Sequence, residues 1–112
     1  MGTFTMPDPG RMTARLTLEQ PVNEPDGQGG VSQGWQAIAT LWALIEPQSF
    51  TREERGEAEI ATIDQTVTIR FRTDVARGYR LVKGTRILAV RALRDPDETK
   101  RFLLLDCEEE VR

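Results

Sequence analysis

The stretch "TIDQTVTIRFR", residues 62–72, alternates apolar and polar side chains along most of its length. Val67, Ile69 and Phe71 fall on one face, and the threonines and arginines between them fall on the other. Alternation of this kind, rich in β-branched residues, is typical of a strand with one face against a core. This stretch therefore predicts a mainly β fold.

Other segments repeat the pattern. In the last of these segments, residues 101–111, the apolar run from Phe102 to Leu105 predicts a strand that is buried on both faces. Within residues 79–93, a turn is expected at Lys83-Gly84. Five to seven short strands joined by turns predict a small antiparallel β-barrel or sandwich. The further strand candidates are residues 14–22, 79–93 and 101–111.

Two segments between these strands are harder to interpret. Residues 35–47, "WQAIATLWALIEP", fit both a helix face and an alternating strand, so periodicity leaves helix and strand open. Residues 49–62 are highly charged and contain Gly56, which predicts a long charged loop or a short helix.

The stretch "EPDGQGGVSQGW", residues 24–35, holds four glycines. A phosphate-binding loop needs Lys-Ser or Lys-Thr after its last glycine, but here Trp35 follows Gly34. No βαβ unit surrounds the stretch, so a dinucleotide site is also excluded. Glycines between two apolar alternations mark a turn, so we expect a hairpin tip.

The 112-residue chain is long enough for one domain. We expect a flexible N-terminal leader over residues 1–12 and a single β domain over residues 13–112. The apolar runs are too short to span a bilayer. Cytosolic synthesis is inferred from the single cysteine, Cys107.

Residues that could carry catalysis are few. The chain has no histidine, so neither the serines nor Cys107 have the commonest activating base. We therefore predict no enzyme activity and no cofactor or metal, and we place Cys107 in the core. An enzyme with a metal held only by carboxylates remains an alternative, because acidic residues gather within 53–59.

The net charge of −3 is distributed unevenly. Residues 1–69 carry four basic and ten acidic side chains, residues 70–94 carry eight basic and one acidic, and residues 95–112 carry three basic and seven acidic. These blocks can neutralise one another across strands or between copies of the chain. An OB-like barrel that binds nucleic acid through residues 70–94 is the competing interpretation.

Four motifs follow one another along the chain: "RLTLEQPV", "DGQGGVSQGWQAIATLWALIEP", "TVTIRFRTDV" and "YRLVKGTRILAVRALRDPDETKRFLLLDCEEEV". Their order resembles that of the head-tail joining proteins (head completion or stopper proteins) of long-tailed bacteriophages and gene transfer particles, over roughly Thr13 to Val111. The resemblance implies that residues 35–47 form a strand. It also implies that residues 49–62 are a long excursion facing a central channel.

The resemblance further implies a structural role in a ring of six or twelve copies. Such a ring completes the head, retains DNA and lets it pass on ejection. Its implied partners are a portal-side adaptor, a tail terminator or tail tube protein, and double-stranded DNA that passes without sequence-specific binding; no membrane is involved. The chain would be made in the bacterial cytoplasm and assembled into the neck of a virion or gene transfer particle.

Two groups of site residues follow as hypotheses. Acidic residues on a channel loop would repel DNA phosphates and reduce friction, and the charge blocks would pair between neighbouring copies. The channel-loop candidates are Arg52, Glu53, Glu54, Arg55, Glu57 and Glu59. The inter-subunit candidates are Arg70, Arg72, Arg91, Glu108, Glu109 and Glu110.

Overall fold

The computed structural model describes residues 7–25, 27–56 and 58–111, and these form a mainly β structure. A short 3-10 turn at Pro9–Arg11 precedes the strands, and Met12 behind it is buried. Residues 1–6 of the predicted leader lie outside the described residues. The strands are β1 (Ala14–Pro25), β2 (Val31–Arg55), β3 (Ala58–Arg70), β4 (Arg80–Lys83), β5 (Arg86–Arg94) and β6 (Phe102–Val111).

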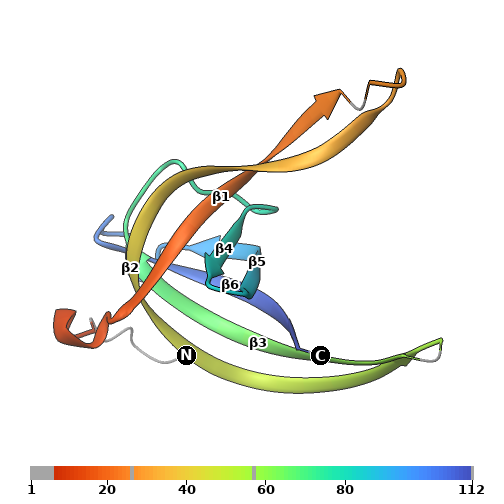
Figure 1. The fold of residues 1–112 in the computed structure, drawn as a ribbon. Helices are drawn as coiled ribbons and strands as arrows, with labels where there is room; N and C mark the ends of the chain where they lie inside the picture. Colours follow the sequence, from red (N-terminus) through yellow and green to blue (C-terminus); the bar gives the residue numbers. More distant parts are fainter. Residues whose placement is uncertain (1–6, 26, 57, 112) are drawn as a thin grey trace.

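The strands form one antiparallel sheet in the order β1-β2-β3-β6-β5-β4 (Figure 1). Residues 17–19 of β1 pair with residues 80–82 of the short strand β4, which closes the sheet into a barrel. Closure gives both edges of the central part of the sheet a partner for their backbone hydrogen bonds. The prediction of a small antiparallel β fold is confirmed.

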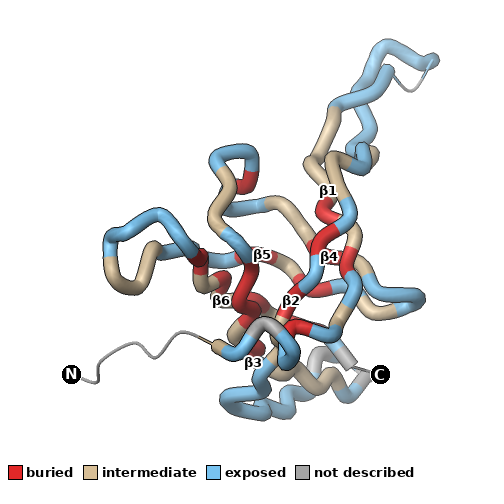
Figure 2. The backbone as a smooth tube through the Cα atoms, turned by 90° about the vertical axis from the view of Figure 1, so that its left-hand side faces the viewer, coloured by how far each residue is buried: buried red, intermediate tan, exposed pale blue. Residues whose placement is uncertain are grey.

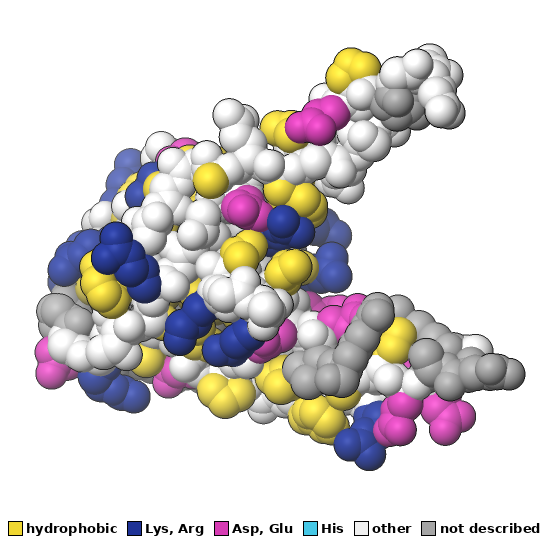
Figure 3. Space-filling view, in the orientation of Figure 1, with side chains coloured by type: hydrophobic (Ala, Val, Ile, Leu, Met, Phe, Trp, Pro, Cys, Tyr) yellow, Lys and Arg dark blue, Asp and Glu magenta, His cyan; other side chains and the backbone are white. Residues whose placement is uncertain are grey.

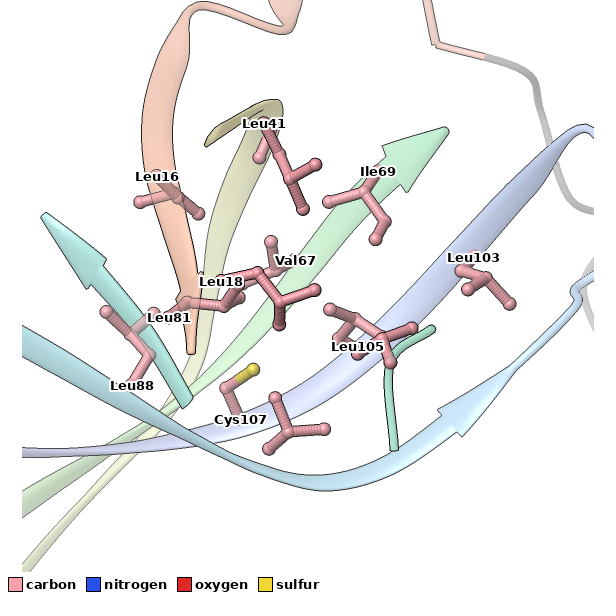
Figure 4. Packing of buried hydrophobic residues seen from close by; sticks show 13 residues of the cluster. Leu16, Leu18, Leu41, Val67, Ile69, Leu81, Leu88, Leu103, Leu105 and Cys107 are labelled. Atoms are coloured by element: carbon pink, nitrogen blue, oxygen red, sulfur yellow. The ribbon is translucent and has the colours of Figure 1, made fainter. Parts of the chain in front are cut away.

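The core fills the inside of this barrel. Figure 2 shows the buried residues gathered where the strands meet, while the projecting hairpins are exposed. Leu18, Leu88 and Leu105 are fully buried, and the side chains from opposite strands point toward one another (Figure 4). Three of the four residues in the run from Phe102 to Leu105 are buried, which largely confirms the expectation drawn from that run.

Residues 35–47 lie within β2, so the strand implied by the resemblance is confirmed and the helical periodicity is misleading. Ala43 shows the reason, because it pairs with Ala14 of β1 on one side and with Ile69 of β3 on the other. β1 pairs with residues 31–43 of β2 and β3 pairs with residues 43–55, so backbone pairing with one strand or the other continues along the whole of β2. No local sequence pattern encodes that gain.

Strand β2 also extends beyond the barrel at both ends (Figure 1). We call residues 19–37 the β1–β2 arm and residues 48–63 the β2–β3 arm. The prediction of a loop or short helix over residues 49–62 is wrong, because β2 and β3 pair from Ser49–Asp64 to Arg55–Ala58. The arms give a radius of gyration of 15.8 Å, against about 13 Å expected for a compact chain of this length.

A β-bulge lies at the base of each arm. Ile38 is the extra residue of β2 opposite the step from Leu18 to Glu19, and Gln48 is the extra residue between the pairs that Pro47 and Ser49 make with β3. A bulge bends its strand and strengthens the local twist. The two bulges therefore set the directions in which the arms leave the barrel.

The glycine stretch forms the turn of the β1–β2 arm, which confirms the predicted hairpin. The last strand pair is Pro25 with Val31, and Gly27 and Gly29 adopt the positive φ angles of 81° and 84°. Glycine reaches this region of backbone conformation without the strain that a Cβ atom causes. The turn needs these glycines for its backbone geometry.

Candidate assembly surfaces

The β2–β3 arm carries the residues predicted to line a channel. Arg52 pairs with Glu59 across the two strands at 2.8 Å, and its guanidinium lies 5.7 Å from the ring centroid of Phe50. Glu53 and Glu54 are exposed close to the turn. Arg55 ends β2 with only its backbone described. Glu57 lies outside the described residues.

The register divides the arm into two faces. Phe50, Arg52 and Glu54 alternate along β2 and share a face with Ile63, Ala61 and Glu59, which lie opposite them. We call this set the Phe50 face. On the other face, Thr51 lies opposite Thr62, and Glu53 lies opposite the half-buried Ile60. One side of the ribbon therefore offers an exposed aromatic ring, and the described side chains of the other offer two hydroxyls, one carboxylate and one isoleucine.

Several inter-subunit candidates pair within their own chain. Arg72 donates two hydrogen bonds to Asp74 at 2.7 Å each, and these bonds lower the pKa of the Asp74 carboxyl. Arg91 approaches Glu108 at 3.6 Å. Arg70 is exposed, and it pairs with no carboxylate in the described part of the chain. Of the exposed inter-subunit candidates, Arg70 therefore keeps its charge most available.

Glu109 is the most buried member of the predicted set. Its carboxylate accepts two hydrogen bonds from Arg86, at 2.7 and 3.0 Å, and a third from the Gln65 amide at 3.1 Å. The bond from Arg86 is the main reason that the pKa of Glu109 is lowered. Alternation from Leu105 and Cys107 already places Glu109 on the inner face, so the sequence held this signal.

The cross-strand pairing considered for the basic block is confirmed for Glu108 and Glu109. Four of the eight basic residues in 70–94 pair with carboxylates of the same chain. A groove for nucleic acid needs cations left available for phosphates. The pairing therefore does not favour the OB-like alternative.

The β1–β2 arm is braced against the barrel by Arg80 of β4. Its Nε donates to Glu19 Oε1 at 2.6 Å, and its guanidinium lies 4.1 Å from the ring centroid of Trp35. An Arg stacked on Trp and paired with a carboxylate is held in one orientation. The brace joins β4 to both strands of the arm close to its bulge.

Replacing Arg80 with alanine is expected to loosen the β1–β2 arm without unfolding the barrel. Hydrogen exchange of amides in residues 31–37 should rise at least several-fold, while amides of β3 and β6 stay protected. Arg77→Ala is the control, because Arg77 is exposed and makes no ion pair in the described part of the chain. Unchanged exchange in the arm would show that Arg80 does not brace it.

Surface residue Trp42 was not among the predicted site residues. It is 55% exposed on the outside of the barrel, with the Arg15 guanidinium 5.3 Å from its ring centroid. Leu41 and Ala43 on either side are buried, so the alternation of this strand was the available signal. Because residues 35–47 also fit a helix, the periodicity did not place Trp42 on an outer face.

The chemistry that the sequence left open concerns metal-binding groups and the single cysteine. The described residues contain no group of three histidine, cysteine, aspartate or glutamate side chains able to hold a metal ion. Cys107 is buried, and burial raises the pKa of its thiol to about 12, which keeps it protonated and unreactive. The described residues also form no helix long and apolar enough to cross a membrane.

Comparisons with known proteins found one matching family and similar solved structures. Residues 7–110 match the family model described as phage head completion protein. A chain from the virion of a native gene transfer agent particle is 27% identical, with a TM-score of 0.76 over 88% of this chain and 94% of that one. Protein SF1141 from Shigella flexneri 2a is 21% identical, with a TM-score of 0.64 over 91% and 96% of the two chains, and shares the fold. No curated protein matches in sequence.

Proposed function

Because the chain belongs to the phage head completion protein family, we propose that it forms a ring in the neck of a phage-like particle, between the portal or its adaptor and the tail. In this position the ring completes the filled head, retains DNA and lets it pass on ejection. The family match covers nearly the whole barrel, and the similar chain from a gene transfer agent virion supports a place in a particle.

The two hairpin arms are the observation that carries this proposal. They project from a filled barrel, and the outer part of each is a two-stranded ribbon (Figure 1). Such a ribbon is marginally stable by itself in water and gains stability from a partner. Figure 3 shows that the surface between the arms is hollowed, as suits contact with another subunit. The proposed role is structural rather than catalytic.

The tip of the β2–β3 arm is the proposed channel lining. Of the channel candidates, Glu53 lies on the face opposite Phe50 and is proposed to point into the channel, whereas Arg52, Glu54 and Glu59 lie on the Phe50 face. A lining with excess carboxylates repels the phosphates of duplex DNA, so the duplex slides without being held. Six and twelve copies are both compatible with a contact in which unlike patches meet and the ring closes by rotation.

The proposal is tested in particles assembled without this chain. Filled heads that lack it should lose their DNA to added nuclease, and negative-stain images should show heads without tails. Supplying the wild-type chain should restore both nuclease protection and tail attachment. Heads that keep their DNA and carry tails without the chain would contradict the proposal.

A further inference from the structure

A cation–aromatic–cation row crosses three strands on the outside of the barrel. Arg15 of β1 lies opposite Trp42 of β2 in the register, and the neighbouring pair Ala43–Ile69 places Arg70 of β3 next along the same face. We call Arg15, Trp42 and Arg70 the Trp42 row. Trp42 and Arg70, together with Met12 and Thr13, line a hollow of about 540 Å³.

The composition of this row is that of a protein interface. Trp and Arg are the residue types most enriched among those that carry binding energy between proteins. In the part of the chain that the structure describes, no carboxylate pairs with Arg15 or Arg70. The row therefore presents two positive charges beside an exposed indole, and a fitting partner supplies an apolar side chain and a carboxylate.

The Phe50 face of the β2–β3 arm has this complementary chemistry. Phe50 is 56% exposed, and Glu54 lies on the same face toward the tip. Arg52 is already paired with Glu59 on that face, so Glu54 leaves it with one net negative charge. The single strand β2 carries both surfaces: Trp42 lies in its middle, and the β2–β3 arm extends from one end (Figure 1).

We propose that the Trp42 row of one copy binds the Phe50 face of the next copy's arm. Phe50 occupies the hollow beside Trp42, and Glu54 pairs with Arg70. Two different patches meet in this contact, so each copy can both give an arm and receive one, as ring closure requires. The proposal rests on the proposed ring and specifies which surfaces join its subunits. The opposite face of the arm, which carries Glu53, is left to the channel.

Mixing two variants with one defect each tests this pairing directly. Trp42→Ala removes the receiving row but keeps the arm, and Phe50→Ala removes the arm's anchor but keeps the row. Wild-type protein should assemble in light scattering, and each variant alone should stay monomeric. Their mixture should give 1:1 heterodimers, which native mass spectrometry resolves because the two variants differ in mass. Ile87→Ala is the matched control, since Ile87 is 45% exposed on β5 and belongs to neither surface; it should assemble as wild type does.

A charge exchange supplies the second measurement. Arg70→Glu should prevent assembly, and adding Glu54→Arg in the same chain should restore it, because the pair is rebuilt with its signs reversed. The proposed pairing is overturned if the mixture of Trp42→Ala and Phe50→Ala stays monomeric, or if the double variant Arg70→Glu, Glu54→Arg stays unassembled. The nuclease assay on particles tests the ring's function separately. Wild-type protein that remains monomeric at its highest soluble concentration also overturns the pairing. The pairing is also overturned if Trp42→Ala leaves assembly intact and abolishes binding of a single-stranded DNA oligonucleotide.

Discussion

Replacing Leu105 with alanine is expected to lower the free energy of unfolding by about 2–5 kcal/mol. The side chain is fully buried at the centre of the barrel, among the other core side chains shown in Figure 4. Its loss removes apolar contacts and leaves a cavity that a closed sheet cannot fully collapse around. Urea unfolding followed by tryptophan fluorescence measures the change.

Leu93→Ala is the matched control for this prediction. Leu93 lies opposite Leu105 in the register of β5 and β6, but it is 38% exposed. The same chemical change there should cost about 1 kcal/mol or less, because water already contacts the side chain. Equal losses at the two positions would show that the core does not lie where the barrel places it.

Replacing Glu109 with glutamine is expected to lower stability at neutral pH and to flatten its dependence on acid. The pKa of Glu109 is below its usual value in the folded chain, chiefly because Arg86 donates to it. The stability that the Glu109 carboxylate contributes is therefore fully present at pH values above its pKa in the unfolded chain, near 4.5. This stability is lost as the pH falls through the lower pKa of Glu109 in the folded chain. Arg86 is 41% exposed, so solvent weakens the pair, and we expect a loss of about 1–2 kcal/mol at pH 7.

Thermal unfolding between pH 7 and pH 2.5 measures this effect. Wild type and Glu109→Gln should differ most at pH 7 and converge at the acid end, where the Glu109 carboxylate is protonated. Glu108→Gln is the control, since Glu108 and Arg91 are 3.6 Å apart and their side chains are 40% and 60% exposed; it should change stability by less than about 0.5 kcal/mol. A difference between wild type and Glu109→Gln that grows with acid would contradict the assigned role of Glu109.

The sequence by itself determined the fold class and part of the core. Alternation over residues 62–72 put Val67 and Ile69 inside, and the glycines of residues 24–35 marked a hairpin turn; both hold in the structure. These features are local, because side chains alternate with period two and glycine alone reaches positive φ cheaply. The family resemblance added the strand at residues 35–47, where periodicity alone gave two answers.

The tertiary structure decided what depends on distant pairing. Residues 49–62 are charged and contain a glycine, yet they are held as strands because β2 and β3 satisfy each other's backbone groups. The Trp42 row exists only because the register brings Arg15 and Arg70 to either side of Trp42. Strand register is set by contacts between residues far apart in the sequence, and a one-residue shift would turn every side chain to the other face. For that reason the candidate assembly surfaces could be located only from the strand register in the tertiary structure.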